Sequence, residues 1–209
     1  RREDVKKALN TLHEAFFEER VKQLNLFVMG VGNVGSRLMD QIRRQQQVLK
    51  KEHRLLLRVV GISNSRHMAF SENGLDLEQW ETVLESGPPA DLQEFHRRVC
   101  ELNLRNAIFV DNTASAEVSD WYGKYLQESI AVVTCNKIAC SSAYGTYDRL
   151  KELSLDYSAP FLFETNVGAG LPIIDTLKNL VLSGDRIHKI QAVLSGSLNF
   201  IFNRYAGES

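Results

Sequence analysis

The sequence predicts an α/β protein built on a doubly wound parallel sheet. Two observations support this fold class: short apolar segments alternate with stretches of helical periodicity, and the first apolar segment runs directly into a glycine-rich turn. Strands that alternate with helices pair in parallel, with right-handed crossovers that place helices on both faces of the sheet. The 209 residues, of which 44% are hydrophobic, are enough to bury such a core.

Five strands are expected where short runs of apolar and β-branched residues occur. These runs are residues 24–29, 55–62, 107–111, 130–134 and 160–164. Helices are expected where apolar residues recur every three to four positions. These stretches are residues 34–51, 91–102, 115–126, 144–153 and 172–183, with Ser115 as the expected cap of the third and Pro172 at the start of the last.

Both ends of the chain depart from this alternation. Residues 1–23 carry an apolar stripe among charges and predict an amphipathic helix, interpreted as a linker or a packing helix. Near the other end, residues 187–194 alternate as a strand does, and a further helix is expected over residues 195–205. We therefore expect one domain over residues 24–165 and the truncated start of another over residues 166–209.

The composition excludes several classes of protein. Lys plus Arg number 25 and Asp plus Glu number 26, which gives a net charge of −1, so the basic patch of a nucleic-acid-binding protein is not expected. No apolar run approaches the roughly 18 residues of a membrane span, and no membrane partner is expected. Three cysteines are few and odd in number, which indicates a reducing compartment and predicts a cytoplasmic location.

The glycine-rich turn has the pattern G-x-G-x-x-G between the first expected strand and the first expected helix. In this context Gly30 permits the tight turn, Gly32 lets the backbone approach a pyrophosphate, and Gly35 lets the helix pack closely on the strand. The N-terminus of the helix supplies unpaired N–H groups for the phosphates. The turn therefore predicts a dinucleotide site, with a purely structural turn as the alternative. Its residues are Gly30, Val31, Gly32, Asn33, Val34 and Gly35.

The end of the second expected strand indicates which dinucleotide binds. A site selective for NAD places Asp or Glu there, where the carboxylate accepts a hydrogen bond from the ribose 2′-hydroxyl. This chain has Ser63, Asn64 and Arg66 instead. Small polar groups and a guanidinium suit a 2′-phosphate. We therefore predict NADP as the cofactor, with NAD still accepted; a merely solvated Arg66 is the alternative.

Further candidates follow the third and fourth strands, because ligands of open α/β sheets lie beyond the carboxyl ends of the strands. Asn112 and Thr113 are suited to hydrogen-bond nicotinamide or ribose, or to form a turn and cap a helix. Lys137 is suited to donate to a carbonyl oxygen or shuttle a proton, and a solvated lysine is the alternative.

Metal and cysteine chemistry are less well supported. Cys135 and Cys140 lack a second cysteine pair or a suitably spaced histidine, so a zinc site is not expected. The small-residue loop at 164–172 exposes backbone carbonyls, which are ligands for a hard cation, although a plain tight connection explains it equally well.

Taken together, five motifs in this order make the chain resemble homoserine dehydrogenase. They are G-V-G-N-V-G-S, V-D-N-T-A-S, V-T-C-N-K, E-T-N-V-G-A-G-L-P and L-S-G-S-L-N-F-I-F, and the resemblance runs from about residue 24 to the end. The segments R-R-Q-Q-Q-V-L-K-K and N-G-L-D-L-E-Q-W resemble the dehydrogenase portion of bifunctional aspartokinase–homoserine dehydrogenase. In that setting residues 1–23 resemble the helical linker from an absent upstream kinase region.

The resemblance implies a Rossmann-type NAD(P)-binding domain followed by the truncated start of an α+β substrate and dimerisation domain. It implies interconversion of L-aspartate 4-semialdehyde and L-homoserine, in threonine and methionine biosynthesis, by a parent that forms a homo-oligomer. Thr113 and Lys137 would then lie near the nicotinamide, with Lys137 catalytic, while Gly196 and Ser197 would contact the substrate. The resemblance also implies a sodium ion at four positions: Glu164, Val167, Ala169 and Leu171.

The chain departs from the family in one respect, and two other functions remain as alternatives. The family's substrate-binding glutamate and its catalytic aspartate and lysine belong to a segment beyond residue 209, so we expect the fragment alone to be inactive. A non-catalytic dinucleotide-binding or regulatory module is one alternative. The other is a different semialdehyde dehydrogenase that uses Cys135 as its nucleophile.

Overall fold

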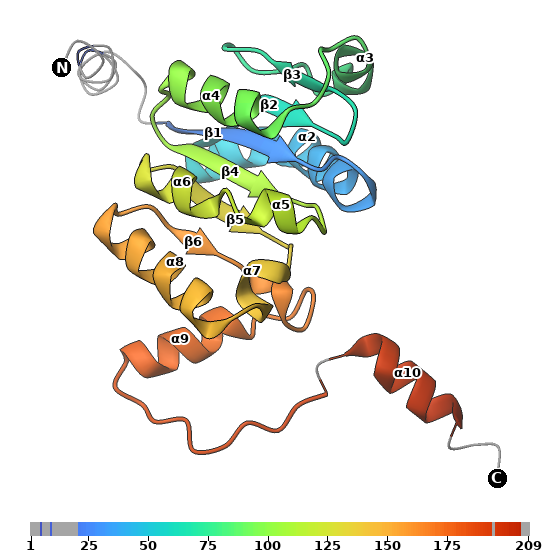
Figure 1. The fold of residues 1–209 in the computed structure, drawn as a ribbon, viewed down its shortest axis with the longest axis vertical. Coiled ribbons are helices and arrows are strands. Elements are labelled where there is room, and N and C mark those ends of the chain that lie inside the picture. The colour runs from blue at the N-terminus through green and yellow to red at the C-terminus, as the bar shows by residue number, and fades with distance from the viewer. Residues whose placement is uncertain (1–4, 6–8, 10–20, 194, 206–209) are drawn as a thin grey trace. The chain divides into compact units, whose positions relative to one another are not determined.

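The computed structural model describes residues 5, 9, 21–193 and 195–205, and Figure 1 shows it. It divides into two compact units, Arg1–Phe161 and Leu162–Ser209. Most of the helix expected over residues 1–23 lies outside the described residues. Its last two residues, Lys22 and Gln23, belong to the first strand instead.

The first unit is built on a six-stranded sheet with the order β3-β2-β1-β4-β5-β6. Strand β1 pairs in parallel with β2 and β4, and β4 pairs in parallel with β5. The doubly wound parallel sheet is therefore confirmed, with the strand order typical of dinucleotide-binding folds. The strands are β1 (Lys22–Met29), β2 (Leu55–Ser63), β3 (Met68–Phe70), β4 (Ala107–Asp111), β5 (Ala131–Thr134) and β6 (Phe161–Leu162).

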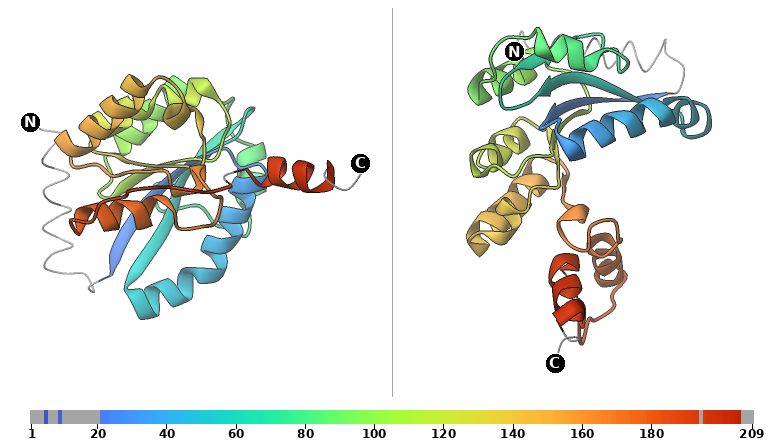
Figure 2. Two further views of the ribbon diagram at one scale, coloured as in Figure 1. Left: turned by 90° about the horizontal axis from the view of Figure 1, so that it is seen from below. Right: turned by 90° about the vertical axis from the view of Figure 1, so that its right-hand side faces the viewer.

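Helices cover both faces of this sheet, as the alternating pattern predicts. Figure 2 shows α2 on one face and α4, α6 and α8 on the other. The helices of this unit are α2 (Asn33–His53), α3 (Trp80–Glu85), α4 (Leu92–Leu102), α5 (Ala116–Ser119), α6 (Tyr122–Gln127), α7 (Ile138–Ser141) and α8 (Tyr144–Asp156). Within the described ranges, every helix is too short or too polar to cross a bilayer.

The two faces of the sheet bury different side chains, because successive residues of a strand point to opposite faces. Toward α2 the core is aliphatic, with Leu26 and Val28 of β1 packed with Met39 and Ile42. Toward α4 and α6 the core is aromatic. Its rings are Phe27, Phe70, Phe95, Phe109, Tyr122 and Tyr125, linked by contacts that include a Phe109–Tyr125 stack at 4.0 Å.

Several expected elements differ from the structure. The helix expected over residues 115–126 is two helices, α5 and α6, which share one continuous apolar stripe because both pack on the same face. Ser115 caps α5 as expected, accepting from the Val118 N–H at 3.4 Å. The strand expected over 160–164 is reduced to β6, and β3, which pairs antiparallel with β2, was not expected at all.

The second unit contains a short 3₁₀ turn, η1 (Glu164–Asn166), and two helices, α9 (Ile174–Leu182) and α10 (Gly196–Tyr205). Both helices confirm the predictions made from the helical periodicity of the sequence. The strand expected over residues 187–194 is wrong for residues 187–193, and Leu194 lies outside the described residues. A strand requires a hydrogen-bonded partner, and none of the described residues pairs with this segment.

Candidate functional site

The last residues of four strands lie side by side at one edge of the sheet. The strand register pairs Met29 of β1 with both Ser63 of β2 and Asp111 of β4, and Asp111 with Thr134 of β5. The loops that follow these strands carry the glycine turn, the Asn112–Thr113 segment and Lys137, so the fold brings the predicted cofactor and catalytic residues of the first unit to a common edge (Figure 1). The order in which strands are added to the sheet reverses between β1 and β4, and open α/β sheets bind their ligands at this point.

The glycine turn has the conformation that its sequence requires. Gly30 has a φ of +86°, and its N–H donates to the Ser63 carbonyl at 2.8 Å. A Cβ atom on Gly30 would lie 2.7 Å from Thr113 Cγ2, and one on Gly35 would lie 2.0 Å from the Gly30 carbonyl oxygen. Both positions therefore require glycine for close packing of the turn against the start of α2.

Gly32 differs from these two glycines, because a Cβ atom there would meet nothing within 4 Å. The open space lies at the N-terminus of α2, whose first turn holds no acidic residue and receives no side-chain cap from the described part of the chain. Unpaired N–H groups and the positive end of the helix dipole remain there to bind an anion. The turn thus fits a pyrophosphate, with Asn33 and Val34 exposed beside Gly32.

The turn after β2 is held by Asn64. Its side-chain Oδ1 accepts from the N–H groups of Arg66 and His67, both at 2.7 Å. Ser63 is buried, and its hydroxyl donates to the carbonyls of Asn64 and His67 at 3.1 and 3.3 Å. Ser63 and Asn64 therefore shape this turn, whereas the exposed Arg66 places a cation where an NAD-selective site has a carboxylate.

The Asn112–Thr113 segment combines a structural role with an unused donor. The Thr113 N–H donates to Asp111 Oδ1 at 2.7 Å, and its hydroxyl oxygen accepts from the Ser115 N–H at 3.2 Å. Thr113 is thus part of the turn after β4. Among the described residues, the buried Nδ2 atom of Asn112 has no hydrogen-bond partner. Because buried donors are normally paired, this atom is suited to a ligand group.

Lys137 follows β5 and directly precedes α7, with its side chain exposed. Two residues earlier, burial raises the pKa of the Cys135 thiol, and the neighbouring Asp111 raises it further against the opposing effect of Lys137. A nucleophilic cysteine requires a lowered pKa. The raised pKa of the thiol therefore argues against Cys135 as a nucleophile.

Sequence reasoning missed the buried polar residues behind these loops: Asp111, Tyr122, Thr134 and Asn136. Their side chains hydrogen-bond one another beneath the Thr113 and Lys137 turns. The signal in the sequence was a carboxylate at the end of an otherwise apolar strand. Tyr122 gave no signal, because it belongs to an apolar helical stripe.

The candidate sodium site belongs to the second unit and fits a cation incompletely. Both oxygens of the Glu164 carboxylate accept backbone N–H groups at the start of α9, from Ile174 at 2.9 Å and Asp175 at 2.8 Å. The carbonyl oxygen of Leu171 also accepts a hydrogen bond, from the Ile173 N–H. Among the described residues, no group of three or more His, Cys, Asp and Glu side chains is suited to a metal. Val167 and Ala169 offer carbonyls only, and the loop serves first as a cap for α9.

The two predicted substrate residues also belong to the second unit. Gly196 and Ser197 form the first turn of α10, and both are exposed. The preceding residue, Ser195, caps this helix, accepting from the Leu198 N–H at 3.2 Å.

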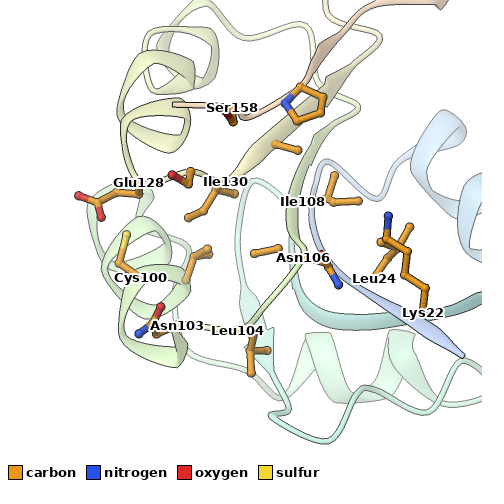
Figure 3. A pocket seen from close by; sticks show the side chains of 15 residues that line it. Lys22, Leu24, Cys100, Asn103, Leu104, Asn106, Ile108, Glu128, Ile130 and Ser158 are labelled. Carbon is orange, nitrogen blue, oxygen red and sulfur yellow. The ribbon is translucent and has the colours of Figure 1, made fainter. Parts of the chain in front are cut away.

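A cavity of about 510 Å³ lies at the other end of the strands (Figure 3). Its lining includes Lys22, Ala107 and Ala131, the first residues of β1, β4 and β5, together with Cys100 and Asn103 from α4 and the residue after it. Burial raises the pKa of Cys100 to about 11. None of the predicted site residues lines this cavity, so it is separate from the cofactor site.

Comparison with known proteins agrees with the geometry. Residues 30–164 match the family model "Homoserine dehydrogenase, NAD binding domain", and residues 172–209 match "Homoserine dehydrogenase". The chain is 39% identical over 209 residues to bifunctional aspartokinase/homoserine dehydrogenase 1 of Arabidopsis thaliana, covering 99% of this chain and 23% of that protein. It is 32% identical over 182 residues to homoserine dehydrogenase of Schizosaccharomyces pombe, covering 86% and 48%.

Solved structures give the same result. A Candida auris protein described as of unknown function has a TM-score of 0.78 at 33% identity, over 88% of this chain and 50% of that one. A hyperthermophilic archaeal homoserine dehydrogenase in complex with NADPH has a TM-score of 0.63 at 27% identity, over 78% and 50%. The chain spans about a quarter of the Arabidopsis relative and about half of the S. pombe one. Because the family model of the NAD-binding domain covers most of its length, the chain belongs to the homoserine dehydrogenase family.

Proposed function

We propose that this chain is the cofactor-binding part of an NADP-preferring enzyme that interconverts L-aspartate 4-semialdehyde and L-homoserine. The observation that carries the proposal is the edge of the sheet where the open Gly32 turn, the Asn112–Thr113 segment and Lys137 meet. Membership of the homoserine dehydrogenase family supports the substrate class. The complex of the archaeal relative with NADPH supports a nicotinamide dinucleotide.

In this proposal the glycine turn holds the pyrophosphate. The Gly32 turn offers backbone N–H groups and the open space next to them, while Gly30 and Gly35 keep the turn close to α2. Arg66 pairs with the 2′-phosphate of NADP, and the exposed position of its side chain leaves the guanidinium free to do so. Asn112 offers its unpaired Nδ2 atom to the cofactor.

Lys137 assists the chemical step. NADPH, when bound, would supply a hydride to the aldehyde carbon of the semialdehyde. Negative charge then develops on the aldehyde oxygen, and the Lys137 ammonium stabilises it by donating a hydrogen bond or a proton. In the direction of homoserine oxidation the Lys137 side chain acts in its unprotonated amine form and accepts the hydroxyl proton.

The remaining assignments concern the parts of the protein around this site. We assign residues 166–209 to the start of the substrate and dimerisation domain, with Gly196 and Ser197 in contact with homoserine. The sodium ion, the homo-oligomer, the role in threonine and methionine biosynthesis and the cytoplasmic location remain predictions. For the location, the Arabidopsis relative is named as chloroplastic.

The test is homoserine-dependent reduction of NADP by the full-length protein that contains this chain. Lys137→Ala should lower kcat about 10²- to 10⁴-fold, the usual contribution of a general acid or base. Lys50→Ala, an exposed lysine near the end of α2, serves as the matched control and should leave kcat unchanged. An inactive wild-type protein would instead favour a non-catalytic dinucleotide-binding module.

A further inference from the structure

One buried carboxylate lies beneath both loops of the proposed site. Asp111, at the end of β4, is fully buried. Its Oδ1 atom accepts from the Thr113 N–H at 2.7 Å. Its Oδ2 atom accepts from the Tyr122 hydroxyl at 2.5 Å and from Asn136 Nδ2 at 3.0 Å. Three donors on one carboxylate compensate for its burial, because an unpaired buried charge would be strongly destabilising.

Asn136 extends this network to both sides of Lys137. Its Nδ2 atom also donates to the Ser115 carbonyl at 2.8 Å, and its Oδ1 atom accepts from the Ile138 N–H at 3.1 Å. Its own N–H donates to Thr134 Oγ1 at 2.9 Å. The backbone before and after Lys137 is therefore tied to the network, although the lysine side chain itself is exposed.

Tyr122 connects the network to helix α6. Its hydroxyl lies between Asp111 Oδ2 and Thr134 Oγ1, the latter at 2.7 Å. Burial raises the pKa of Tyr122 well above its ordinary value, and the nearby Asp111 carboxylate raises it further. The phenol therefore remains protonated and donates to the carboxylate.

We propose that Asp111 and Tyr122 form a positioning unit that fixes the Thr113 turn and the Lys137 turn relative to each other. This inference rests on the proposed function, in which those turns hold the nicotinamide and the catalytic ammonium. The rate of a bound reaction depends steeply on such alignment, since a displacement of about 1 Å can cost about a hundredfold. Asp111 and Tyr122 act through Thr113 and Lys137 and touch no reacting atom.

The central test compares two tyrosines of the same helix in the full-length protein. Tyr122→Phe removes one donor from Asp111, whereas Tyr125→Phe removes another buried hydroxyl, from a side chain that is 2% exposed. Tyr122→Phe should lower kcat for homoserine oxidation about ten- to a hundredfold with little change in the KM for homoserine. Tyr125→Phe should leave both constants close to wild type.

Amide hydrogen exchange supplies a second readout that does not depend on activity. In Tyr122→Phe and Asp111→Asn, residues 112–115 and 136–138 should exchange faster together, while Tyr125→Phe keeps the wild-type pattern. In Asp111→Asn one carboxylate oxygen is replaced by an N–H₂ group, which then faces at least one of the three hydrogen-bond donors. Asp111→Asn should therefore increase the exchange rates more than Tyr122→Phe does. If Asp111→Asn does not fold, the two tyrosine variants still decide the question.

The outcomes separate this inference from the proposed function. A wild-type protein without homoserine-dependent activity refutes the proposed function, and hydrogen exchange alone then decides whether the two turns are coupled. An active wild type in which Tyr122→Phe matches Tyr125→Phe in kcat and in exchange overturns the positioning unit. Faster exchange in only one of the two segments overturns it as well.

Discussion

Single atoms distinguish the glycines of the cofactor turn from one another. Gly35 has no room for a methyl group, because its Cβ would lie 2.0 Å from the backbone oxygen of Gly30, whereas a Cβ on Gly32 meets nothing within 4 Å. Gly35 is therefore required by the packing of the turn, whereas Gly32 leaves open the space that the proposed cofactor would occupy. The pattern G-x-G-x-x-G alone does not show which glycine is required for packing and which one leaves space for a ligand.

Gly35→Ala should destabilise the first unit. The new methyl group forces apart backbone that cannot yield easily, and overpacking of this kind costs about 1–3 kcal/mol. For a chain of this length the melting temperature should fall by roughly 3–10 °C. Thermal unfolding measures the melting temperature. Gly145→Ala is the control, because a Cβ atom on Gly145 meets nothing within 4 Å. Equal melting temperatures for the two variants would contradict the close packing of the turn.

Arg66→Ala should remove the preference for NADPH over NADH. A charge-assisted hydrogen bond to the 2′-phosphate contributes about 1.5–3 kcal/mol, so NADPH affinity should fall at least about tenfold while NADH affinity stays the same. Fluorescence titration of both nucleotides gives the ratio. Arg149→Ala, an exposed arginine on α8, is the control. An equal loss of affinity for both nucleotides, or no loss of affinity, would show that Arg66 does not bind the 2′-phosphate.

At the scale of elements, periodicity predicts where helices and strands lie but not how they end or pair. Strand β4 has the expected bounds because apolar residues fill it and polar ones follow it. The stripe over residues 115–126 predicts one helix, yet the Ser119 hydroxyl bonds back to the Ala116 carbonyl at 2.8 Å and the helix breaks after it. Segment 187–193 alternates as a strand does, but alternation does not provide a pairing partner.

Glu164→Ala should loosen the start of α9. Both carboxylate oxygens accept N–H groups of the first helical turn, and loss of such a cap costs about 1 kcal/mol. The amides of Ile174 and Asp175 should therefore exchange about fivefold faster. Glu152→Ala, which removes an exposed carboxylate from α8, provides the comparison. Unchanged exchange in Glu164→Ala would show that the carboxylate does not act as this cap.

At the scale of the whole molecule, the strand register brings distant parts of the sequence to one site. Gly30, Asn112 and Lys137 are far apart along the chain, yet the strands that precede them end side by side. The sequence alone predicts this convergence, because parallel strands share a carboxyl edge. It does not predict the buried bonds among Asp111, Tyr122 and Asn136, because those depend on how α6 packs on the sheet.

The most direct test of the cofactor site is titration of NADPH into the 209-residue chain and its Gly32→Val variant. The wild-type chain should bind one NADPH with a saturable change in nucleotide fluorescence. Gly32→Val should bind at least about a hundredfold more weakly at an unchanged melting temperature, because its side chain enters open space where the pyrophosphate has to lie. Equal NADPH affinity in the two proteins would contradict the assignment of the glycine turn as the cofactor site.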